Sequence, residues 1–179
     1  MRIISGTAKG RRLQTLPGDD VRPTSDKVKE GIFSAIQFDI EGRRFLDLFA
    51  GSGQMGLEAL SRGALSATFV DASAQSIKVC KENVNSTGFS EFSKIHRNDA
   101  LAFLALTNET FDIAFLDPPY SAGLLEKALF AVAKKMSDYG IIICEHPPEV
   151  NLPEQVDDFL VYKKYRYGKI NLTTYKKEQ

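Results

Sequence analysis

The sequence is poor in the residues that usually build metal centres and disulfides: it has two cysteines, two histidines and no tryptophan in 179 residues. Cys80 and Cys144, like His96 and His146, stand at no metal-ligand spacing, which excludes a zinc motif and a disulfide framework. No apolar run is long enough to span a bilayer, and the N-terminus lacks the apolar region of a signal peptide. We therefore expect a cytoplasmic monomer that binds neither a metal nor a membrane.

The formal net charge is zero, but the basic residues gather at both ends of the chain. Residues 1–12 and residues 162–177 contain no acid, and in the second range lysines alternate with tyrosines. Such basic ends favour contact with a polyanion at one or two surfaces. Two simpler interpretations remain: solvated termini, or an edge strand whose lysines discourage aggregation. We expect residues 1–179 to form a single domain, with 1–24 as a short basic extension.

Strand and helix patterns alternate through most of the sequence. The expected strands are 45–49, 67–70, 94–96, 111–116 and 141–144, and the helices between them are 55–62, 72–85, a short helix after Asp99, and 124–136. An earlier helix, capped by Thr24, Ser25 or Asp26, precedes them, and a hairpin of 159–164 and 169–175 follows. Alternating βα units predict an α/β fold, with helices on both faces of a mostly parallel sheet and ligands at the carboxyl ends of its strands.

A glycine-rich turn follows the first predicted strand of this series. Gly51 and Gly53 permit a tight turn that brings backbone close to a ligand, and Gly56 permits close contact between helix and strand. The next strand ends in Asp71, about 20 residues beyond Gly51, where an acid accepts hydrogen bonds from a ribose. This arrangement predicts a nucleoside cofactor.

The same turn also matches an oxidoreductase that binds NAD or FAD. Asp47 argues against that alternative, because a negative charge is unfavourable beside a pyrophosphate, whereas it suits a cationic amino-acid cofactor. No later segment supplies a nicotinamide site or an acid–base histidine.

The tetrapeptide Asp117-Pro118-Pro119-Tyr120 follows the apolar run 111–116. Two prolines have no N–H and fix φ near −65°, so the chain there is stiff and offers acceptors only. A planar guest that carries an NH₂ group, such as a nucleobase with an exocyclic amine, fits this pocket beside the Tyr120 ring. An ordinary turn at the end of a strand is the alternative.

Two further residues have two interpretations each. Asp99 could accept a hydrogen bond from an adenine amine or cap the following helix, and the two roles are compatible. Cys144 could be the nucleophile of a pyrimidine C5 methyltransferase or a small buried residue.

Together these motifs resemble a Rossmann-like methyltransferase that depends on S-adenosylmethionine and modifies an exocyclic amine. The segments 2–6, 10–13, 57–64 and 22–30 narrow the resemblance to bacterial 16S ribosomal RNA guanine-N2 methyltransferases of the RsmD type. Gln54 departs from the pattern, since a small residue is expected there. The resemblance implies a class I methyltransferase fold with seven strands, mostly parallel, and an antiparallel strand in the C-terminal hairpin.

The resemblance also implies the substrate, which is the N2 amine of guanine 966 in 16S ribosomal RNA, on assembled or partly assembled small subunits. The implied catalytic residues are Asp117, Pro118 and Tyr120. The implied cofactor-binding residues are Asp47, Phe49, Ala50, Gly51, Ser52, Gly53, Asp71, Asn98, Asp99 and Asp117. The implied RNA-binding residues are Arg2, Lys9, Arg11, Arg12, Arg22, Thr24, Pro119 and Tyr120. Alternatives are an adenine-N6 methyltransferase acting on RNA or DNA, and a non-catalytic RNA-binding assembly factor.

Overall fold

Hydrogen bonding joins eight strands into one sheet in the part of the chain that the computed structural model describes, residues 1–18, 24–121 and 123–178. The strands are β1 (Arg44–Asp47), β2 (Ser66–Asp71), β3 (Ser93–Arg97), β4 (Phe111–Leu116), β5 (Met136–His146), β6 (Gln155–Val156), β7 (Phe159–Tyr167) and β8 (Ile170–Lys177). The α-helices are α1 (Asp26–Ala35), α2 (Gln54–Ser61), α3 (Ala74–Thr87), α4 (Ala100–Leu106) and α5 (Leu124–Ala133), and a 3₁₀ turn covers Ser90–Phe92.

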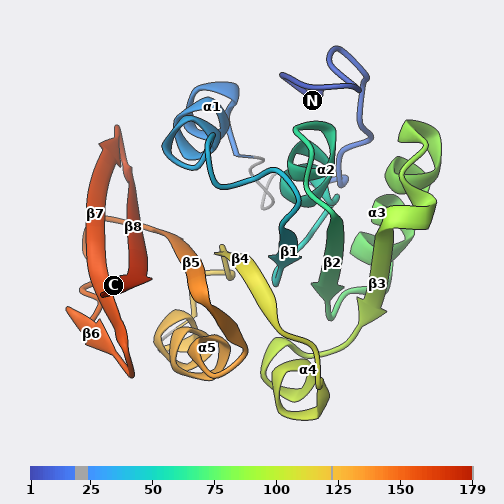
Figure 1. Ribbon diagram of the computed structural model, residues 1–179. Helices are drawn as coiled ribbons and strands as arrows, with labels where there is room; N and C mark the ends of the chain where they lie inside the picture. The colour runs from blue at the N-terminus through green and yellow to red at the C-terminus, as the bar shows by residue number, and fades with distance from the viewer. Residues whose placement is uncertain (19–23, 122, 179) are drawn as a thin grey trace.

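The strand order is β3-β2-β1-β4-β5-β8-β7-β6 (Figure 1). The first five strands are parallel, and the last three continue the sheet in antiparallel pairs. This confirms the predicted α/β fold with a C-terminal hairpin. The expected count of seven strands was one short, because β6 is a two-residue strand with no apolar pattern of its own. The predicted helix 124–136 ends at Ala133, since Met136 already pairs with Phe111 at the start of β5.

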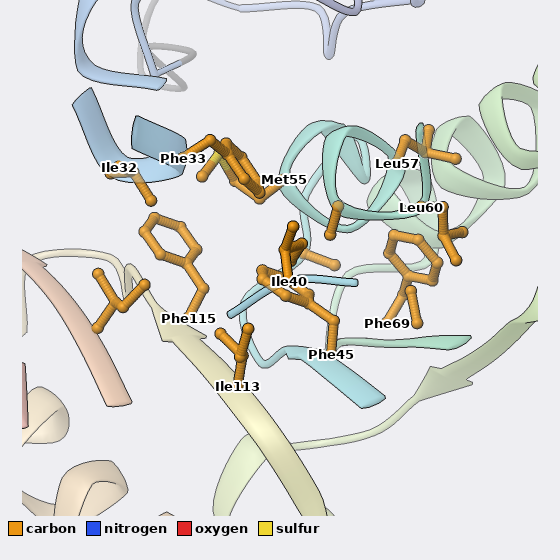
Figure 2. Close-up of a cluster of buried hydrophobic side chains, with 14 of the residues drawn as sticks. Ile32, Phe33, Ile40, Phe45, Met55, Leu57, Leu60, Phe69, Ile113 and Phe115 are labelled. Carbon is orange, nitrogen blue, oxygen red and sulfur yellow. The ribbon is translucent and has the colours of Figure 1, made fainter. Parts of the chain in front are cut away.

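Helices cover both faces of the sheet, with α1, α2 and α3 on one face and α4 and α5 on the other (Figure 1). Side chains of β4 alternate between two buried clusters: Ile113 and Phe115 pack under α1 and α2, and Ala114 and Leu116 face α4 and α5. Figure 2 shows the first cluster, in which Phe33 of α1 lies over Phe45 of β1 at 6.3 Å between ring centroids. This two-sided burial explains why the strands are almost continuously apolar.

Side-chain caps mark the first residues of helices α1 and α4. Of the three candidates for the first helix, Ser25 is the cap, and its hydroxyl accepts the Val28 N–H at 3.3 Å. The Asp99 carboxylate accepts the Ala102 N–H at 2.9 Å and begins α4, which confirms its predicted capping role. No helix in the described ranges has the length and apolarity needed to cross a membrane.

The first residues of the chain pack on α2 through one buried carboxylate. Glu58 is fully buried, and its oxygen accepts the Ile4 N–H at 2.9 Å. The Nζ of the fully buried Lys29 lies 3.5 Å from Glu58 and donates to the Arg2 carbonyl at 2.7 Å. Arg62 completes the cluster, with its Nε 3.0 Å from Glu58. The predicted extension is therefore, over its described residues, tied to the helix that follows the glycine turn.

We predict that Glu58→Ala lowers the free energy of unfolding by about 3–5 kcal/mol, because it leaves Lys29 as an unpaired buried charge. Urea denaturation followed by circular dichroism measures this loss. Glu154→Ala is the matched control, since the Glu154–Lys164 pair is exposed and its removal should cost under ~1 kcal/mol. Equal losses in the two variants would contradict the anchoring role of Glu58.

Candidate functional site

Acidic side chains collect at the carboxyl ends of four neighbouring parallel strands. Asp47 ends β1, Asp71 ends β2, Asp117 follows β4, and Glu145 is the penultimate residue of β5. The strand order places these ends at one edge of the sheet, where ligands of doubly wound folds bind. The sequence predicted the first three of these acids as site residues.

The glycine turn is held by the acid at the end of the next strand. Gly51 has φ 54° and Gly53 has φ 85°, values that favour glycine. One oxygen of Asp71 accepts the Gly51 N–H at 2.9 Å, and the other accepts the Ser73 N–H at 2.9 Å. A Cβ on Gly53 would lie 2.8 Å from the Cys80 sulfur. Asp71 thus fixes the turn, and each of its oxygens retains a lone pair for a ligand hydroxyl.

Asp47 lies beneath the turn rather than on its surface. The residue is 1% exposed, and its carboxylate accepts the Gly56 N–H at 3.1 Å near the start of α2. Burial raises the pKa of Asp47 to about 7, against the smaller opposing effect of that hydrogen bond. Its described role is to hold strand and helix together, and direct contact with a cofactor stays a prediction.

The remaining predicted cofactor residues lie around the same three strand ends. Phe49, Ala50 and Ser52 form the turn, and the Ser52 carbonyl accepts the Asn83 side-chain N–H at 2.9 Å. The Asn98 N–H donates to the Asp71 carbonyl at 3.1 Å, so the segment that carries Asp99 runs beside β2.

The side chain that departs from the family pattern carries an orphan acceptor. The amide oxygen of Gln54 is buried with no hydrogen-bond donor among the described residues. It sits where the turn enters α2, so a ligand bound at the turn could supply the missing donor. The turn, the lone pairs of Asp71 and this orphan atom fit a nucleoside cofactor that carries an amino-acid group.

Asp117 differs from the other acids because the structure gives it no compensating partner. Its position at the strand end is only partly exposed, and no residue in the described parts of the chain donates to its carboxylate. Burial raises the pKa of Asp117 to about 7. Pro118 is buried, whereas Pro119 is exposed and Tyr120 is 78% exposed. The segment therefore carries a partly exposed carboxyl group and, three residues later, an exposed aromatic ring, and their joint use in binding a base stays a prediction.

Glu145 is a further candidate for this site that the sequence alone did not indicate. It is 6% exposed, and the Thr24 hydroxyl donates to its Oε2 at 3.4 Å. Burial first, and then the neighbouring Asp117, raise the pKa of Glu145 to about 8. The available signal was a charged residue directly after the apolar run 141–144, in the strand beside β4.

The predicted RNA-binding residues differ in their exposure to solvent. Arg2, Lys9, Arg11 and Arg12 are exposed, and an antiparallel bridge joins Arg2 to Arg12. Thr24 is buried against Glu145, and Arg22 lies outside the described residues. The N-terminal cations thus lie on the α2 side of the sheet (Figure 1), and their contact with RNA stays a prediction.

The cysteine-nucleophile alternative finds no support in this geometry. Cys144 is fully buried, and burial raises the pKa of its thiol, which disfavours the reactive thiolate. Across the described ranges, no group of three His, Cys, Asp or Glu residues could hold a metal ion. The Nε2 of His146 instead lies 2.8 Å from the Thr173 hydroxyl.

Comparison with known proteins gives a consistent family. The family model described as "Conserved hypothetical protein 95" matches residues 1–176. The putative rRNA methyltransferase YlbH of Bacillus subtilis is 43% identical, with 99% of each chain covered. The ribosomal RNA small subunit methyltransferase D of Escherichia coli is 31% identical over 99% of this chain and 90% of its own.

A solved structure agrees over nearly the whole chain. The putative methyltransferase yhhF from Escherichia coli superposes with a TM-score of 0.89 at 31% identity, covering 99% of this chain and 98% of that chain. The sheet order described above is therefore that of a Rossmann-like methyltransferase. The chain belongs to the conserved hypothetical protein 95 family, the family of the ribosomal RNA small subunit methyltransferases D.

Proposed function

We propose that the protein transfers a methyl group from S-adenosylmethionine to the N2 amine of guanine 966 in 16S ribosomal RNA, on assembled or partly assembled small subunits. The observation that carries this proposal is the Asp117 carboxylate, which has no donor among the described residues and is followed three residues later by the exposed Tyr120. The names of the relatives, which are ribosomal RNA methyltransferases, support the substrate class.

The cofactor is assigned to the ends of β1, β2 and β3. The turn at Gly51 and Gly53 would approach it with backbone, Asp71 would accept from ribose hydroxyls, and Asp99 would accept from the adenine amine. When bound, S-adenosylmethionine supplies an electrophilic methyl group. The orphan oxygen of Gln54 offers an acceptor to its ammonium group.

Asp117 would hold and activate the amine of the base. Its carboxylate accepts an N–H of the NH₂ group and turns the nitrogen lone pair towards the methyl group. Formation of the N–C bond would be matched by cleavage of the S–C bond of the sulfonium, whose electron pair stays on the departing neutral thioether. It would also require the amine to lose one proton, which a carboxylate whose pKa is about 7 is matched to accept at neutral pH. Tyr120 would stack on the base, a contact worth roughly 1–3 kcal/mol in comparable sites.

Of the two other candidate functions, the structure disfavours the non-catalytic assembly factor and does not distinguish the adenine-N6 methyltransferase. A non-catalytic assembly factor would have no reason to keep an unpaired carboxyl at the strand end, because burying such a group costs stability. The adenine-N6 alternative uses the same pocket and is separated from guanine-N2 transfer by product analysis.

A methyl-transfer assay tests the proposal. Small subunits, naked 16S ribosomal RNA and large subunits from a strain that lacks the corresponding enzyme are incubated with the protein and tritiated S-adenosylmethionine. We expect label in small-subunit RNA, released on digestion as N2-methylguanosine. Label absent from all three substrates, or found only in N6-methyladenosine, would refute it.

We predict that Asp117→Ala lowers kcat by roughly 10²–10⁴-fold, because it removes both the amine acceptor and the proton acceptor. Cofactor affinity, measured by calorimetry, should stay within about 3-fold of wild type, since the turn is held by Asp71. Wild-type turnover in the folded variant would show that Asp117 does not have this role.

Gly51→Val should abolish cofactor binding in calorimetry, because its side chain would enter the space above the turn. A Cβ there meets no chain atom nearer than Leu16, at 3.8 Å, so the fold itself leaves room. Gly88→Val is the matched control: Gly88 has φ 81°, a Cβ there meets nothing within 4 Å, and it lies at the far end of α3. Both variants carry similar backbone strain, and unchanged cofactor affinity in Gly51→Val would overturn the cofactor assignment.

Cys144→Ala should retain activity within about 3-fold, since amine methylation needs no covalent attack on the base. Steady-state kinetics on small subunits provides the measurement. A folded but inactive variant would instead indicate a cysteine nucleophile and methylation at a pyrimidine ring carbon.

A further inference from the structure

Asp117 and Glu145 form a pair of carboxyl groups on adjacent strands. Leu116 of β4 lies opposite Cys144 of β5 in the parallel register, so the next residues along the two strands are Asp117 and Glu145. Leu116 and Cys144 both point into the cluster under α4 and α5, which directs the following residue of each strand to the other face. The two carboxyl groups are therefore side by side, about 5 Å apart at the backbone, on one face of the sheet.

Such a pair carries a single proton at neutral pH, on one of its two members. Neighbouring carboxylates in a poorly solvated site cannot both ionise without a large cost in free energy. The groups that face Glu145 leave this repulsion uncompensated: Asp117 comes from β4, the Thr24 hydroxyl from the segment before α1, and apolar Leu172 from β8. His146 points to the opposite face, towards Thr173. Within the described ranges, no cation pairs with either carboxyl group.

The proton belongs on Glu145 rather than on Asp117. Glu145 is 6% exposed and accepts the Thr24 hydroxyl, whereas Asp117 keeps partial access to solvent, which favours its ionised form. Burial raises the pKa of both groups, and the neighbouring Asp117 raises that of Glu145 further. The site then presents one carboxylate acceptor and one carboxylic acid donor in a fixed order along the sheet edge.

We propose that protonated Glu145 donates a hydrogen bond to the O6 carbonyl of the target guanine and thereby determines the choice of base. The inference rests on the function proposed above, in which Asp117 holds the N2 amine. Guanine presents its amine and its O6 on the same edge, with N1–H between them, so two groups one strand apart can engage both. In adenine, counting from the amine along the same edge, a C–H group occupies the position that corresponds to O6. The acid would therefore lose its partner with adenine.

If Glu145 has this role, Glu145→Leu should lower kcat/KM and Glu145→Gln should not. Gln keeps an N–H donor for O6 that does not titrate, whereas Leu removes the donor and leaves O6 unpaired. We expect Glu145→Leu to lower kcat/KM on small subunits by roughly 10–100-fold and Glu145→Gln to stay within about 3-fold of wild type. Calorimetry should show unchanged cofactor affinity in both. Asp138→Asn, a neutralised acid at the exposed start of the same strand, is the matched control and should behave as wild type.

The pH profile provides a readout that a structural role would not move. Wild-type kcat/KM should rise as Asp117 ionises near pH 7 and fall as Glu145 loses its proton near pH 8. In Glu145→Gln the fall at high pH should disappear. The stability of the fold should also depend on this proton. Neutral Glu145 stabilises the folded state at low pH, and this contribution is lost as the pH rises through about 8. Glu145→Gln should therefore lose less stability than wild type between pH 6 and pH 9.

Retained activity in Glu145→Leu, or equal losses in the Gln and Leu variants, would overturn this inference. Both outcomes require a wild-type enzyme that methylates guanine N2, so they leave the proposed function standing. A wild-type protein that transfers no methyl group to guanine would instead refute the proposed function, whatever the variants do.

Discussion

The chemistry of this protein depends on the burial of carboxyl groups where parallel strands end. Burial disfavours the charged form of each group, and the chain provides hydrogen-bond donors to some of these carboxyl groups but not to others. Asp47 accepts the Gly56 N–H, and Asp71 accepts the Gly51 and Ser73 N–H groups. Asp117 has no donor in the described structure. In the proposed function the substrate amine is assigned to Asp117, because it is the group that the chain leaves uncompensated.

A second buried charge connects the basic N-terminus to this edge of the sheet. Glu58 lies on α2, the helix that begins at the glycine turn, and it accepts backbone N–H groups of residues 4 and 5. Lys29 on α1 pairs with the same carboxylate, so α1, α2 and the first residues form one unit. Thr24 directly precedes Ser25, the cap of α1, and its hydroxyl donates to Glu145. The exposed N-terminal cations and Glu145 are thus held on one connected framework.

The sequence predicted the fold, which the structure confirms, and it proposed most of the candidate site residues, whose roles stay predictions, because the signals were local. Strand, turn and helix signals around Gly51, Gly53 and Asp117 lie within short segments, and each carries its own stereochemistry. Glu145 was missed because its importance comes from register: only pairing between β4 and β5 sets it beside Asp117. The anchoring role of Glu58 was also hidden, since its partners at residues 4 and 29 are distant in sequence. Strand β6 was not predicted, because a strand of two residues shows no periodic pattern.

In the proposed mechanism, Asp117 holds an exocyclic purine amine at the end of β4. Mass-spectrometric mapping of 16S ribosomal RNA tests this role most directly, by comparing a deletion strain, the same strain carrying the gene, and the strain carrying Asp117→Ala. We expect one N2-methylguanosine that is absent after deletion, restored by the wild-type gene and not restored by the variant. A missing methyl group on a ribose or on a pyrimidine ring carbon, or restoration by Asp117→Ala, would contradict it.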